Sequence, residues 1–147
     1  MTKMDLKNIR DPEQLSRMKK LKSKGECHFC GDITKKHTAP VIYRNNKWFV
    51  VANDFPYTGS THHYLIVPTR HITKLTDLST DDQLKLFDAI GWLEKKLGVK
   101  GFSVFVRSGD MSYTGATLDH IHFHFIVGKK RTKNTEWLMV TLGYKKK

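Results

Sequence analysis

The sequence predicts an α+β fold with a mostly antiparallel sheet, because strand-like segments are grouped before and after a single long helix. Segments rich in β-branched and aromatic residues lie at 39–44, 47–52, 63–68, 101–107 and 118–128. Strands grouped in this way are typical of α+β domains, whereas strict alternation with helices predicts a parallel sheet. The first two segments are predicted to form a hairpin through Asn45 and Asn46, because asparagine tolerates the positive φ of a tight turn.

The long helix, predicted at 78–98, carries its own start and stop signals. Ser79 and Asp82 have the spacing of a capping box, with Asp in place of the usual Glu. An apolar stripe at helical spacing follows, at Leu86, Ile90, Leu93 and Leu97. Gly98 then ends the helix. The stripe predicts a face that packs on the core rather than a cofactor site.

Each end of the chain is predicted to carry one element. Asp11 and Pro12 provide an N-cap and a proline at the first helical position, and Gly25 provides a stop. Residues 1–25 are therefore interpreted as a basic arm with one helix. At the other end, residues 135–144 are predicted to form a last strand before a lysine tail.

Length and composition indicate one domain with its own core. The chain has 147 residues, of which 39% are hydrophobic, and this suffices for a core without disulfide bonds. It has no run of 18 apolar residues, and its polar start lacks the apolar stretch of a signal peptide. We therefore expect a soluble cytoplasmic protein that does not bind membranes.

The net charge of +12, from 26 Lys and Arg against 14 Asp and Glu, favours an anionic partner such as a nucleotide, a polyphosphate or a nucleic acid. Much of the excess lies in the basic runs 17–24, 129–133 and 145–147, which also fit solvated chain ends. A module that binds nucleic acid non-specifically through these runs is therefore an alternative function. No recognisable nucleic-acid-binding motif accompanies the charge.

Three of the eight histidines, His120, His122 and His124, alternate with bulky apolar residues in a segment that is predicted to be a strand. Alternate side chains of a strand share one face, so a row of imidazoles is expected on one face and a buried apolar row on the other. Such a row fits a catalytic zinc site or a nucleophilic histidine that attacks phosphorus. The third interpretation, ordinary surface histidines, is disfavoured by the strict alternation.

The two cysteines, Cys27 and Cys30, are separated by two residues. In a reducing compartment this spacing indicates a metal-binding or redox pair before it indicates a structural disulfide.

Several motifs together resemble the histidine triad (HIT) superfamily. The segment "HIHFHFI" at 120–126 matches the pattern His-x-His-x-His-x-x, in which x is hydrophobic. "CHFC" at 27–30 is similar to the CxxC of many bacterial members, and 53–72 resembles their segment ending in Pro-x-x-His. "TGATLDHIHFH" resembles the glycine-rich approach to the triad, so the resemblance covers about residues 26–128.

The resemblance implies a five-stranded antiparallel sheet with one long helix, to which the N-terminal basic helix is added, and a homodimer. It implies a HIT domain at 26–128, preceded by the arm and followed by a basic extension at 129–147. It also implies a nucleotidyl hydrolase that attacks the α-phosphate of a dinucleoside polyphosphate or another adenylate conjugate. A nucleotidyltransferase or phosphorylase of the same fold is the alternative.

The same resemblance implies a role for each triad histidine. His122 corresponds to the nucleophile that takes the nucleotidyl group, and His124 corresponds to the residue that contacts the phosphate and helps the leaving group depart. The first triad histidine belongs instead to a structural zinc site, one ion per chain, whose four ligands would be Cys27, Cys30, His71 and His120. Of the other histidines, His37 is an alternative ligand, whereas His28, His62 and His63 are interpreted as loop or surface residues.

Substrate contacts follow from the resemblance as well. Asn53 occupies the position of a residue that binds the ribose hydroxyls, and Thr117 that of a Ser or Thr near the phosphate oxygens. The chain departs from the family where an Asn or Gln is usual, because Arg107 stands there. Its guanidinium would supply charge and donors to an α- or β-phosphate.

Overall fold

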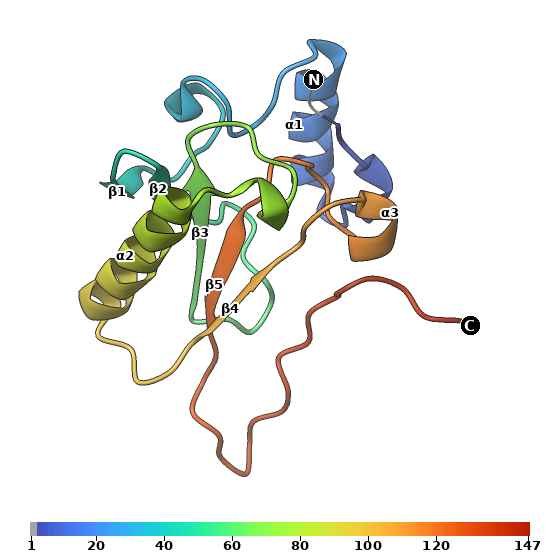
Figure 1. Ribbon diagram of the computed structural model, residues 1–147. Helices are drawn as coiled ribbons and strands as arrows, with labels where there is room; N and C mark the ends of the chain where they lie inside the picture. The colour runs from blue at the N-terminus through green and yellow to red at the C-terminus, as the bar shows by residue number, and fades with distance from the viewer. Residues whose placement is uncertain (1–2) are drawn as a thin grey trace.

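A computed structural model describes residues 3–147, which form one five-stranded antiparallel sheet in the order β1-β2-β3-β5-β4 (Figure 1). The strands are β1 (Val41–Arg44), β2 (Trp48–Ala52), β3 (His62–Pro68), β4 (Ser103–Val106) and β5 (Phe123–Val127). The helices are α1 (Pro12–Ser23), α2 (Thr80–Leu97) and the short α3 (Met111–Thr114), with 3-10 turns at Leu6–Asn8, Ile33–Lys35 and Leu75–Asp77. The predicted α+β class is confirmed. No helix within residues 3–147 is both long enough and apolar enough to cross a membrane.

Helix α2 covers one face of the sheet, and its two ends are capped as the sequence predicts. The side chain of Ser79 accepts a hydrogen bond from the Asp82 backbone N–H, and the Asp82 carboxylate accepts one from the Ser79 backbone N–H, which completes the capping box. Gly98 ends the helix at a φ of 61°. The apolar stripe of α2 packs on alternate residues of the strands, including Trp48, Ile66 and Phe125.

The opposite face of the sheet is covered by the N-terminal arm and the Cys27–Cys30 segment (Figure 1). Asp11 caps α1 by accepting hydrogen bonds from the backbone N–H groups of Glu13 and Gln14. Met18 and Leu21 of α1 are buried against Phe29, Leu65 and the other apolar residues of this face. Within the part of the chain that the structure describes, the arm thus shares the core of the domain, although the boundary proposed at residue 25 stays a prediction.

The start of the arm also pairs with the segment that leads into β5. The Asp5 N–H donates to the Thr117 carbonyl at 2.9 Å, and the Asp119 N–H donates to the Lys3 carbonyl at 3.2 Å. The Asn8 side chain donates to the Ala116 carbonyl. These bonds fix the backbone that approaches the triad.

Two local predictions are wrong in their details. The β1–β2 turn uses no positive φ, because the Asn45 side chain accepts from the backbone N–H groups of Lys47 and Trp48 and closes the turn itself. Residues 135–144 form no strand. They run beside β4 without pairing to it, since β4 is hydrogen-bonded only to β5.

Strand β5 begins at Phe123, so the three triad histidines do not all lie in a strand. Pairing with β3 ends where Ile66 faces Phe123. Before that point the chain bends away, and the Ile121 N–H donates to the Ile72 carbonyl. The bend directs His120 away from the sheet face that carries His124, so the row of histidines is divided.

If α1 is part of the core, shortening Met18 should destabilise the whole domain. We expect Met18→Ala to cost about 2–5 kcal/mol of unfolding free energy, the usual cost of truncating a buried methionine. Lys19→Ala, at the exposed neighbouring position, should change it by less than about 0.5 kcal/mol. Urea denaturation measures both, and equal small effects would show that α1 does not pack on the sheet.

Candidate active site

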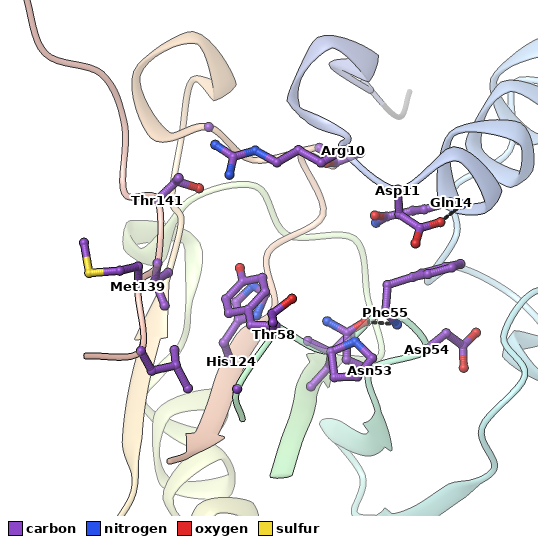
Figure 2. Close-up of a pocket in the computed structure, with 18 of the residues that line it drawn as sticks. Arg10, Asp11, Gln14, Asn53, Asp54, Phe55, Thr58, His124, Met139 and Thr141 are labelled. Atoms are coloured by element: carbon purple, nitrogen blue, oxygen red, sulfur yellow. Dashed lines mark hydrogen bonds between the residues drawn. The ribbon is translucent and has the colours of Figure 1, made fainter. Parts of the chain in front are cut away.

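The candidate active site is an open cavity of about 1570 Å³ beside the sheet face that carries His124. Its walls come from the N-terminal arm, the loop after β2, the triad and the C-terminal segment 134–141 (Figure 2). The structure brings His122, His124, Asn53, Arg107 and Thr117 to this one cavity, as the sequence predicts.

His122 is oriented by the backbone of its own segment. Its Nδ1 lies 2.9 Å from the His120 carbonyl oxygen, and a carbonyl can only accept, so Nδ1 carries the proton. The lone pair of the neutral ring is therefore on Nε2. Burial lowers the pKa of His122 from 6.5 to about 4, while the His120 carbonyl acts in the opposite direction and the Arg107 charge adds to the lowering. His122 is consequently neutral and able to act as a nucleophile at pH 7.

His124 has the opposite tautomer, which is set by a chain of two hydrogen bonds. The backbone N–H of Tyr57 donates to Nδ1 of His63 at 3.1 Å, so the His63 proton lies on Nε2. That Nε2 donates to Nδ1 of His124 at 2.8 Å. In neutral His124 the proton therefore lies on Nε2. Burial, followed by the nearby His122, His63 and Arg107, holds the pKa of His124 well below 6.5.

Arg107 lies next to His124, with Nη1 at 3.3 Å from His124 Nε2. Its guanidinium donates from Nη1 to the Tyr57 hydroxyl at 3.1 Å and from Nη2 to the Thr141 carbonyl at 2.6 Å. A guanidinium has five N–H groups, and the Nε–H is buried with no acceptor among residues 3–147. The His124 Nε2–H and the Arg107 Nη1–H are both donors and do not satisfy each other, so this corner of the cavity is suited to an anion.

Asn53 and Thr117 border the cavity on the sides facing β2 and the triad approach. The Asn53 Oδ1 accepts from the Phe55 N–H at 2.8 Å, which leaves its amide N–H groups as donors beside His63. The Thr117 carbonyl accepts from the Asp5 N–H, whereas its side-chain hydroxyl makes no hydrogen bond within residues 3–147. Both positions offer donors to a polar ligand.

A second cluster lies on the far side of the Phe29 ring, which packs against both His120 and His122. It consists of Cys27, Cys30, His71 and His120, whose ligand atoms all lie within 4.8 Å of one another. His120 Nε2 donates to the Pro68 carbonyl at 2.9 Å, so the His120 lone pair on Nδ1 faces the cluster. The sulfur-to-nitrogen distances are 3.4–3.5 Å, and the two Nδ1 atoms are 3.2 Å apart.

These distances fit a single tetrahedral metal ion. Metal–ligand bonds of about 2.0–2.3 Å place the ligand atoms of a tetrahedral site roughly 3.3–3.8 Å apart. Two sulfurs and a lone pair of His120 converge with Nδ1 of His71, and two sulfurs with two imidazole nitrogens are a donor set that Zn²⁺ binds. On the outer side, His71 Nε2 lies 3.3 Å from an Asp119 carboxylate oxygen, the type of contact that orients metal-binding imidazoles.

The other histidines correct one interpretation. His28, His37 and His63 are all buried, so they are not surface residues. His37 bonds to the His28 ring at 3.0 Å and to the Ala52 carbonyl at 2.6 Å, which places it outside the Cys/His cluster. Sequence reasoning missed the contact of His63 with Nδ1 of His124. The only sequence signal for His63 was strand alternation, which places it on the same face of β3 as Leu65.

Comparison with known proteins agrees with this geometry. A family model described as the HIT domain matches residues 34–131. The chain belongs to the HIT family. It is 31% identical over 91 residues to an uncharacterised HIT-like protein of Chlamydia trachomatis, over 59% of this chain and 78% of that one.

Two further HIT-family comparisons bear on the site. The chain is 27% identical over 67 residues to the adenosine 5′-monophosphoramidase hnt1 of Schizosaccharomyces pombe, over 46% of this chain and 49% of that protein. Its fold is similar to the crystal structure of a zinc-bound histidine triad family protein from Mycobacterium smegmatis. In that comparison the TM-score is 0.54 and the identity 22%, over 79% of this chain and 81% of the other.

The tautomers are open to direct measurement. Long-range ¹H–¹⁵N NMR at pH 7 should show His122 protonated on Nδ1 and His124 protonated on Nε2. His63→Phe should leave the His122 tautomer unchanged while His124 loses its preference, because the donor to its Nδ1 is gone. A His124 ring protonated on Nδ1 in the parent protein would contradict this hydrogen-bond chain.

Proposed function

We propose that this HIT protein is a nucleotidyl hydrolase that acts through a covalent nucleotidyl-His122 intermediate. One observation carries the proposal. Two neighbouring rings, 4.9 Å apart between centroids, have complementary tautomers, with a lone pair on His122 Nε2 and a proton on His124 Nε2. The first suits attack on phosphorus and the second suits donation to a phosphate or leaving-group oxygen.

The reaction has two displacements. In the first, the His122 Nε2 lone pair forms a bond to the α-phosphorus while the bond from phosphorus to the leaving group breaks, and that group keeps the electron pair. The adduct is an imidazolium, since Nδ1 keeps its proton and its bond to the His120 carbonyl. In the second, water attacks phosphorus, the phosphorus–nitrogen bond breaks, and the proton of the water passes to solvent. His122 is regenerated neutral.

Substrate binding is assigned to the residues around these rings. Asn53 would bind the ribose hydroxyls with its free amide N–H groups, and Thr117 would contact the phosphate oxygens. Arg107 would neutralise phosphate charge next to His124. A nucleotide conjugate fits this set, and the phosphoramidase name of the Schizosaccharomyces pombe relative supports nucleotide chemistry in the family.

His122→Ala should stay folded yet lose nearly all turnover, because the covalent path needs its lone pair. His124→Ala should lose less, since only a hydrogen bond to the transition state is removed. Turnover of a panel of adenylate conjugates, followed by mass spectrometry, measures both. An alkaline quench during turnover should trap a nucleotidyl adduct on the His122 peptide of the parent protein. Full activity of His122→Ala would refute the assignment.

The same intermediate can react with an acceptor other than water, which is the transferase alternative. Product analysis with and without added phosphate separates the two. With an adenosine phosphoramidate as substrate, nucleoside monophosphate as the product under both conditions identifies a hydrolase, and nucleoside diphosphate formed only with phosphate identifies a phosphorylase. The homodimer implied by the family resemblance stays a prediction.

We also propose that the Cys/His cluster holds one structural zinc ion through Cys27, Cys30, His71 and His120. Four protein ligands close the coordination shell, so the ion would cross-link the Cys27–Cys30 segment to the triad approach rather than take part in chemistry. The zinc-bound state of the Mycobacterium smegmatis protein supports the choice of zinc as the metal.

The zinc proposal predicts about one zinc per chain after purification without chelator. Cys27→Ser should lose the metal and lower the unfolding free energy, because binding of a structural ion contributes to folding. His62→Ala, which removes a histidine outside the cluster, should keep the zinc ion and the unfolding free energy of the parent. Elemental analysis measures the zinc content of the two variants, and thermal unfolding measures their stability. A metal-free parent as stable as the metal-loaded one would falsify the proposal.

A further inference from the structure

The corner beyond His124 has more positive charge and more N–H donors than the protein itself uses. Of the five N–H groups of Arg107, two are accounted for by the Tyr57 hydroxyl and the Thr141 carbonyl. The Nε–H is buried without an acceptor, and Nη1 also faces the protonated nitrogen of His124 at 3.3 Å. Unpaired buried donors are costly, and an anion placed beside Arg107 and His124 would supply acceptors and would also neutralise the guanidinium charge.

A second arginine lies at the mouth of the same cavity. Arg10 comes from the N-terminal arm, directly before the Asp11 cap of α1, and its side chain points across the cavity toward the segment that carries Thr141 (Figure 2). Within residues 3–147 it has no ion pair and no hydrogen bond, whereas Arg17 on the same wall is bound to Asp54 at 2.5 Å. Arg10 thus faces the cavity as a cation that has no hydrogen-bond or ion-pair partner within residues 3–147.

We propose that Arg107 and Arg10 bind the group displaced by His122, an inference that rests on the function proposed above. This leaving group is a phosphate chain. The substrate class would then be nucleotides joined through a phosphoanhydride, in preference to nucleotides joined to an amine. Arg107 would hold the phosphate next to the α-phosphorus, and Arg10 would hold a phosphate nearer the mouth. Both are specificity-determining residues.

The protonation state of His124 favours a phosphate leaving group over an amine. An amine must gain a proton to depart, and neutral His124 can offer its Nε2 proton only by becoming an imidazolate. Burial and the adjacent arginine hold the pKa of His124 well below 6.5, so the imidazolium that would be a good acid is scarce. A phosphate departs as an anion and needs only the hydrogen bonds and charge that His124 and the arginines supply.

Arg107 is held in place before substrate arrives. Arg107 is fixed between the Tyr57 hydroxyl and the Thr141 carbonyl of the C-terminal segment. That segment is in turn tied to the arm, because the Tyr144 hydroxyl donates to the Asn8 side chain. The two chain ends that the sequence presents as solvated basic tails therefore form the leaving-group side of the cavity.

The test compares two substrates with the same adenylyl group, a dinucleoside polyphosphate and an adenosine phosphoramidate. Arg10→Gln and Arg107→Gln should each lower the ratio of kcat/KM for the polyphosphate to that for the phosphoramidate by about 10- to 100-fold, the loss expected for a charge-assisted contact. Lys19→Gln, which removes an exposed charge of α1 outside the cavity, should leave both values unchanged. Thermal unfolding checks that the variants are folded.

Inorganic triphosphate provides a binding readout without chemistry. It should inhibit the parent competitively, and its inhibition constant should rise about 10-fold or more in Arg10→Gln but not in Lys19→Gln. A parent that turns over both substrates with ratios unchanged by either arginine variant would overturn this inference and leave the hydrolase proposal standing. A parent that turns over neither substrate would overturn both, and equal losses on the two substrates would reduce the arginines to a structural role.

Discussion

The site depends on one stretch of backbone, the bend between Leu118 and Phe123 where the chain enters β5. Within it, the His120 carbonyl fixes the tautomer of His122 while the His120 ring faces the two cysteines. A single residue therefore belongs to both clusters, with its side chain in one and its backbone in the other. Any change that moves His120 is transmitted to the nitrogen that would attack phosphorus. In the proposed mechanism the Cys/His cluster would therefore act on the reaction only by positioning His122.

Two walls of the cavity come from the two ends of the chain, which are joined by the hydrogen bond from the Tyr144 hydroxyl to the Asn8 side chain. The C-terminal segment also lies close to α3, because a Cβ at Gly143 would lie 2.5 Å from the Tyr113 carbonyl oxygen, and the φ of Gly143 is 104°. Only glycine fits there. Four apolar or aromatic side chains of the same segment remain largely exposed, at Trp137, Met139, Leu142 and Tyr144. The segment is held by a few specific contacts rather than by an apolar interface.

Sequence patterns correctly predicted the local features that depend on only a few neighbouring residues. The caps at Asp11, Ser79 and Gly98 are of this kind, since each depends on one side chain or one φ angle and its immediate neighbours. The composition of the Cys/His cluster and of the triad was predictable from the family pattern. Where each residue of the pattern points was not, because the bend before Phe123 depends on contacts with Pro68 and Ile72 of a distant segment.

Two features that could not be predicted from the sequence depend on strand register or on long-range partners. His63 reaches His124 because β3 and β5 pair with Leu65 opposite His124, and nothing local in either segment specifies that offset. Residues 135–144 have strand-like composition, yet composition provides no partner, and β4 accepts none on its outer edge. The role of Asn45 was missed for a different reason. Its side chain mimics a turn bond, which makes a positive φ unnecessary.

In the cavity the histidines supply a lone pair and an N–H donor, and the arginine supplies positive charge. A buried imidazole beside a guanidinium is held neutral, and burial together with Arg107 lowers the pKa of His63 to about 4 as well. Neutral rings can present a lone pair at one position and an N–H at the next, as His122 and His124 do. The positive charge that an anionic substrate requires must then come from groups that cannot lose their protons. Arginine meets that condition. Burial is the main cause that lowers the pKa values of His122 and His124, and Arg107 adds to the lowering while it leaves the site cationic.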